Sequence, residues 1–98
     1  MNKMNDNETV LYAAVVSALT FERLWITEAV IRELKPKIPF LGDAALDWIL
    51  DAVESYVTWG REYVDDKKFL PEWADVLDEL TDEKRIRAEY RKMRGNPG

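Results

Sequence analysis

Carboxylates are the main chemically competent groups of this 98-residue chain, which has 19 Asp and Glu residues but no histidine and no cysteine. Histidine is the commonest general base and transition-metal ligand, and cysteine carries redox chemistry and zinc–thiolate binding. These classes of chemistry are therefore excluded. A metal ion bound here would need oxygen ligands, which suit Mg²⁺ or Ca²⁺.

One carboxylate, Glu22, is unusual because it falls on the apolar side of an expected helix. At helical spacing it lies in the sector of Val15, Ala18 and Ile26. A carboxylate in an apolar interior must be paired, protonated or hydrated. Two interpretations follow: a structural acid at an open helix edge or paired with a cation, or a buried acid that transfers protons or binds a ligand. The second would make the protein an enzyme, with carboxylate-bound Mg²⁺ as its metal.

Two further groups of carboxylates recur at helical spacing, and they comprise Asp47, Asp51 and Glu54, then Asp75, Asp78 and Glu79. Clusters of this kind are typical of hydrated helix faces, and neither matches the twelve-residue calcium loop with its central glycine. The serines have no neighbouring base, and the four glycines form no phosphate-binding loop. We therefore predict no catalytic site, no metal and no cofactor, and a protein that is not an enzyme.

Charge is strongly segregated along the chain, whose formal net charge is −5. Residues 1–42 are neutral overall, residues 43–83 carry thirteen acids and three bases, and residues 84–98 carry six bases and one acid. A basic helix with a tyrosine among its cations suits contacts to phosphates. The bases in question are Lys84, Arg85, Arg87, Arg91, Lys92 and Arg94.

The charge pattern favours a protein that binds another macromolecule. The prediction is a non-enzymatic adaptor or inhibitor, acting on a protein partner through charged helix surfaces. Acidic helix faces can also mimic nucleic acid, as in small phage-encoded inhibitors, which would suit a phage or mobile-element origin. The alternative is a nucleic-acid-associated accessory protein that uses the basic helix 84–94.

Hydrophobic periodicity predicts helices throughout and no strand. The expected elements are a long helix over 8–35 capped by Asn7 or Thr9, a Pro-containing connector over 35–42, and a helix over 43–66 with Asp43 as its cap. Two short helices, 71–80 and 82–94, follow, the second capped by Thr81. Residues 1–7 and 95–98 are expected to be disordered.

Helix 43–66 is expected to be the packing centre, because no charge interrupts its apolar arc between Ala44 and Val64. That arc, which includes Trp48 and Trp59, is wide enough for two neighbouring helices. Gly60 within it indicates either a close crossing by another helix or a bend of this helix, and we favour the close crossing. The all-round apolar segment Val10–Leu19 suggests burial on several sides, or self-association as a dimer.

The predicted fold is a single all-α domain over residues 1–98, a compact bundle of two long antiparallel helices and two short C-terminal ones. Ten apolar residues are too few to cross a bilayer, and Asp6 and Glu8 oppose the positive start that a signal peptide needs. We therefore expect a cytoplasmic protein with no membrane association.

Overall fold

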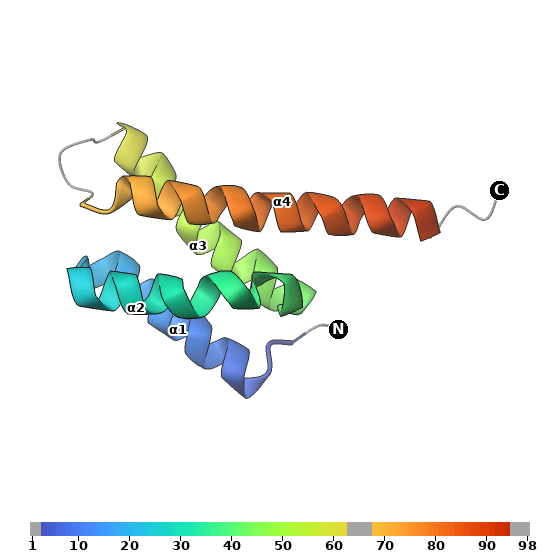
Figure 1. The fold of residues 1–98 in the computed structure, drawn as a ribbon, viewed down its shortest axis with the longest axis horizontal. Coiled ribbons are helices and arrows are strands. Elements are labelled where there is room, and N and C mark those ends of the chain that lie inside the picture. The colour runs from blue at the N-terminus through green and yellow to red at the C-terminus, as the bar shows by residue number, and fades with distance from the viewer. Residues whose placement is uncertain (1–2, 63–67, 95–98) are drawn as a thin grey trace.

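The computed structural model describes residues 3–62 and 68–94, the side chains of residues 60–62 excepted, and these residues are all-α, as predicted. The elements are α1 (Asp6–Phe21), α2 (Leu24–Leu34), the 3₁₀-helix η1 (Lys35–Phe40), α3 (Asp43–Glu62) and α4 (Leu70–Arg94). α1 and α2 form a hairpin, and α3 crosses between this hairpin and α4 (Figure 1). No helix in the described ranges is both long and apolar enough to cross a membrane.

The first helix begins earlier than expected, at Asp6, and its cap is Asn5 rather than Asn7 or Thr9. The Asn5 side chain accepts a hydrogen bond from the Glu8 backbone N–H at 2.8 Å. The Glu8 carboxylate in turn accepts from the Asn5 N–H at 3.0 Å. This reciprocal capping box satisfies two of the donors that a helix start leaves unpaired. The expected disorder of residues 1–7 therefore does not extend over Asn5 to Asn7, whereas residues 1–2 and 95–98 lie outside the described residues.

The expected single helix over 8–35 is wrong, because the chain turns at Glu22. Glu22 adopts a left-handed conformation with φ of 51° and ψ of 45°, and its N–H closes α1 on the Ala18 carbonyl. The reason lies in the phase of the core positions. Buried Ala18 and buried Thr27 are nine residues apart, so one continuous helix would point them in opposite directions. Breaking the helix lets both residues turn into the interior.

The central position of α3 agrees with the sequence prediction, since it packs on both α1 and α4. Its buried face includes Ala45, Ile49 and Val53. Trp48 and Trp59, which the apolar arc included, are instead 56% and 57% exposed. The Trp48 ring is held at the edge of the arc by an edge-to-face contact with Tyr12, 5.7 Å between centroids. The surroundings of Gly60, and so the predicted close crossing, lie outside what is described.

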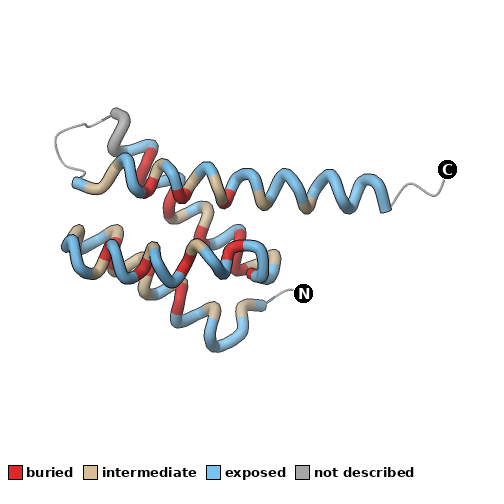
Figure 2. Tube along the Cα trace, viewed as in Figure 1, coloured by how far each residue is buried: buried red, intermediate tan, exposed pale blue. Residues whose placement is uncertain are grey.

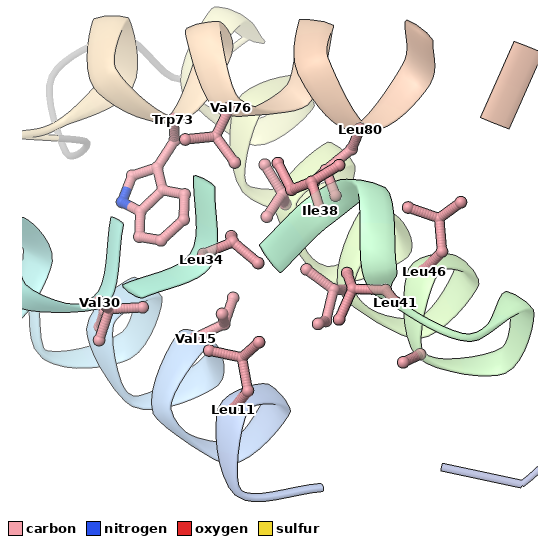
Figure 3. Close-up of a cluster of buried hydrophobic side chains, with 14 of the residues drawn as sticks. Leu11, Val15, Val30, Leu34, Ile38, Leu41, Leu46, Trp73, Val76 and Leu80 are labelled. Atoms are coloured by element: carbon pink, nitrogen blue, oxygen red, sulfur yellow. The ribbon is translucent and has the colours of Figure 1, made fainter. Parts of the chain in front are cut away.

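The core is a single cluster to which every described helix contributes (Figure 3). Trp73 of α4 is completely buried and points toward the α1–α2 hairpin, from which Val15, Val30 and Leu34 enter the same cluster. Ile38 and Leu41 are buried and anchor the connector to the core, whereas Phe40 between them is 85% exposed.

The two short C-terminal helices are in fact one helix, α4, of 25 residues. Thr81 lies within it and caps nothing. Neither glycine nor proline interrupts the segment between Pro71 and Gly95, and Thr costs little helix propensity. The N-terminal part of α4 packs on the core, whereas its C-terminal part runs past the other helices and is almost entirely exposed (Figure 2).

Candidate interaction surface

An apolar groove lies between α1 and α2 and has a volume of about 560 Å³. Its floor is formed by Leu11 and Ala14 of α1, Val30 of α2 and Leu41 after η1, and the exposed Ala29 of α2 also lines it. The helix break at Glu22 creates this groove, because it folds α2 back along α1. The groove is therefore a consequence of the hairpin and has no counterpart in a single helix over 8–35.

Large apolar side chains stand exposed around the groove instead of filling the core. Val10 is 69% exposed and Phe40 is 85% exposed, and both line it. Phe21 and Trp25, on either side of the α1–α2 turn, are also 63% and 70% exposed, but they do not line the groove. Clustered apolar exposure of this kind marks binding surfaces more often than isolated exposed residues do.

Polar residues at the end of the groove hold its shape. Glu8, besides closing the capping box, accepts a hydrogen bond from the Gly42 N–H at 2.7 Å, which ties α1 to the start of α3. Glu33 pairs with Lys37 at 2.9 Å. The hydrogen bond from Lys37 lowers the pKa of the Glu33 carboxyl. These groups satisfy one another, so the groove offers an apolar contact surface with a polar rim.

Glu22, the unusual carboxylate of the sequence, is the polar link between three segments. Its Oε2 accepts hydrogen bonds from the Tyr56 hydroxyl at 2.7 Å and from the Lys68 backbone N–H at 2.9 Å. The Tyr56 hydroxyl in turn accepts from the Phe69 N–H at 3.3 Å. Glu22 is half-buried at the α1–α2 turn, where this network joins the turn to α3 and to the start of α4. These hydrogen bonds give Glu22 a structural role, which is the first of the two interpretations of this carboxylate.

Removing the Tyr56 hydroxyl tests this network. Tyr56→Phe is expected to lower the free energy of unfolding by about 1–2 kcal/mol, because Glu22 loses one of its two donors and the Phe69 N–H loses its acceptor, while the ring keeps its packing. Urea denaturation would measure the loss. Tyr12→Phe, at an aromatic residue whose hydroxyl has no described partner, is the matched control and is expected to change stability little. Equal losses in both variants would argue against the network.

The same hydroxyl predicts a loss of stability at alkaline pH. Burial, and secondarily the hydrogen bond to Glu22, raises the pKa of Tyr56 above its ordinary value of 10.0. Above about pH 10 the unfolded chain ionises this phenol while the folded chain keeps its proton, so the unfolded state binds fewer protons and stability falls as pH rises. Stability is therefore fully present below pH 10 and declines above it, by up to about 1.4 kcal/mol per pH unit. Tyr56→Phe should flatten the decline, and an unchanged slope would contradict the assignment.

The predicted acidic surface is partly used within the molecule. Asp47 pairs with Lys84 at 3.0 Å, and Lys35 pairs with both Asp75 at 2.6 Å and Glu79 at 3.2 Å. The hydrogen bond to Asp75 is the largest of the contacts that raise the pKa of Lys35. The remaining three acids are exposed and have no ion pair within the described residues; they are Asp51, Glu54 and Asp78. The six acids therefore do not act together as one open surface.

Half of the predicted basic surface faces α3. Arg87 donates to Asp43 at 3.1 Å, and Arg91 pairs with the same carboxylate. Lys84 reaches Asp47, one turn further along α3. Asp43, expected as the cap of its helix, therefore serves as the anchor for two arginines.

The other bases point elsewhere. Arg85 pairs along its own helix with Asp82 at 3.4 Å and with Glu89 at 3.8 Å. Arg94 lies over the ring of Tyr90, 5.6 Å from its centroid, and Lys92 is exposed. Around them the exposed end of α4 carries an apolar stripe of Ile86, Tyr90 and Met93.

Neither a metal centre nor a known relative adds to this description. Across residues 3–62 and 68–94, no group of three or more potential ligand side chains could hold a metal ion. Comparison with protein-family models, with curated proteins and with solved structures finds no match. The groove is therefore identified as a candidate binding surface by its lining residues and their exposure.

Of the groove residues, the sequence suggested only those within Val10–Leu19, as a segment for self-association, and none on α2 or η1. The pattern drew attention to charged side chains, whereas the groove arises from apolar residues on either side of an unmarked turn. The sequence did contain one signal of the turn, which is Glu22. A charged residue at a position of the helical pattern that should face the core can mark the end of a helix as readily as a buried acid.

Proposed function

We propose that this protein is a non-enzymatic interaction protein, an adaptor or inhibitor, which binds a protein partner in the groove between α1 and α2. The observation that carries the proposal is the exposure of Val10 and Phe40 on either side of an apolar floor. Part of the proposal is that the protein works in the cytoplasm.

The groove suits an amphipathic helix from a partner. Two antiparallel helices with an apolar depression between them accept the apolar stripe of a third helix, a common mode of peptide recognition. Exposed aromatic side chains at such positions supply the large contact areas on which binding energy concentrates. The charged surfaces contribute less, because Asp47, Asp75 and Glu79 are already paired within the molecule.

Site-specific photo-crosslinking in the source organism tests the proposal. A photoreactive amino acid at Val10, on the groove rim, is expected to give discrete protein adducts. The same group at Glu54, an exposed position on α3, is the control and is expected to give none of them. Adding Phe40→Asp to the Val10 probe should abolish the adducts, because it places a charge in the apolar groove.

The outcomes separate the candidate functions. Adducts that survive Phe40→Asp, or that appear equally from Glu54, would contradict a groove-binding role. Adducts to nucleic acid from a probe at Lys92, absent from the Val10 probe, would instead support the alternative of a nucleic-acid accessory protein.

A further inference from the structure

We propose that the groove between α1 and α2 receives the exposed end of α4 from a second copy of this chain. The inference rests on the groove being a binding surface, as proposed above, and identifies its occupant. Self-association through Val10–Leu19 was an expectation of the sequence; the structure supplies the complementary element.

The end of α4 has the form of a groove ligand. Ile86, Tyr90 and Met93 recur at helical spacing and are 53%, 59% and 77% exposed. They form one stripe along α4. The stripe begins at Ile86, beside Ile38 and Pro39 of η1, and continues along the exposed end of the helix (Figure 2). Helix-in-groove recognition uses anchors at this spacing.

The stripe and the groove match in length. From Ile86 to Met93 the helix rises about 10 Å, and the part of α1 that lines the groove, Asn7 to Ala14, rises by the same amount. Three apolar anchors can therefore lie over the floor formed by Leu11, Ala14 and Val30.

Charge also favours this occupant. α1 and its cap, residues 5–21, contain two acids, Asp6 and Glu8, and no base. Residues 84–94 contain six bases and one acid. Four of these bases form ion pairs within the molecule, and Lys92 and Arg94 have none within the described residues. Placing the exposed end of α4 along α1 brings opposite charges together, whereas pairing the ends of two α4 helices would bring like charges together.

The absence of native cysteine makes disulfide trapping a direct test. Single-cysteine variants Ala14→Cys, on the groove floor, and Met93→Cys, on the stripe, are mixed at equal concentration under mild oxidation. A mixed disulfide dimer is expected. Lys92→Cys, one residue away and turned about 100° around the helix, replaces Met93→Cys as the control and should give about tenfold less product.

Sedimentation of the wild-type chain completes the test, with a weight-average mass rising above 11.5 kDa at tens of micromolar as the expected result. Ala14→Arg and Met93→Asp should each return the chain to a monomer. Three results would each overturn the inference: a strict monomer, trapping by Lys92→Cys equal to that by Met93→Cys, or disulfide dimers formed by Ala14→Cys alone. A monomer that still gives Phe40-dependent crosslinks from Val10 would overturn this occupant but not the groove-binding function.

Discussion

Replacing Trp73 by alanine is expected to lower the free energy of unfolding by about 3–5 kcal/mol, which is a large part of the stability of a small domain. Trp73 is completely buried, and its ring meets that of Tyr56 edge-on with centroids 6.5 Å apart. It points from α4 toward the α1–α2 hairpin (Figure 3), so its removal leaves a cavity that the helices can close only partly.

Urea denaturation followed by circular dichroism measures this loss. Trp25→Ala is the matched control, because Trp25 is 70% exposed and its truncation should change stability by about 0.5 kcal/mol or less. Similar losses in the two variants would mean that Trp73 does not anchor the core as described.

Replacing Arg87 by alanine is expected to cost about 1–3 kcal/mol, the second largest effect predicted here. The Arg87 side chain is only 18% exposed and donates to Glu83 at 2.8 Å, to Asp43 at 3.1 Å, and to the carbonyls of Ile38 and Pro39 at 3.4 and 3.3 Å. It therefore ties α4 to the end of η1 and the start of α3. Burial alone would lower its pKa, but the hydrogen bonds to Glu83 and Asp43 raise it, so the group stays charged.

Arg85→Ala provides the comparison for Arg87→Ala, with the same chemical change two residues earlier. Arg85 is 60% exposed and pairs only along its own helix, so about 0.5 kcal/mol or less is expected. Arg87→Lys should recover only part of the lost stability, because an ammonium cannot reproduce the planar fork of N–H donors that a guanidinium presents. If Arg85→Ala cost as much as Arg87→Ala, the bridging role of Arg87 would be wrong.

The all-α class and the central place of α3 could be predicted because both depend on local periodicity. Ile49 and Val53 recur at helical spacing, and no charge interrupts their face. The hairpin could not be predicted in the same way, because neither glycine nor proline marks the turn at Glu22. That turn is stabilised by Tyr56 and Lys68, which lie far along the chain.

The continuity of α4 could not be predicted because the sequence contains the signal of a helix start at a place where no helix starts. Thr81 followed by Asp82 and Glu83 resembles a helix start, but nothing there prevents the preceding helix from continuing. A cap-like sequence stabilises a helix start only where the chain already leaves the helical conformation.

The candidate surface was the least predictable feature. Which charges are available depends on tertiary pairs such as Lys35–Asp75, formed between residues 40 positions apart. The groove likewise needs the hairpin before its residues meet. The sequence identified suitable residue types in Val10–Leu19, but only the fold determines which of them are exposed.

The central claim is that the groove between α1 and α2 serves binding and not the stability of the fold. The double variant Val10→Asp/Phe40→Asp, examined by urea denaturation and by sedimentation, tests it most directly. Both side chains are largely exposed, so the free energy of unfolding is expected to change by about 1 kcal/mol or less while self-association is lost. A loss of several kcal/mol in stability, or a wild type that self-associates and a double variant that associates equally well, would contradict the claim.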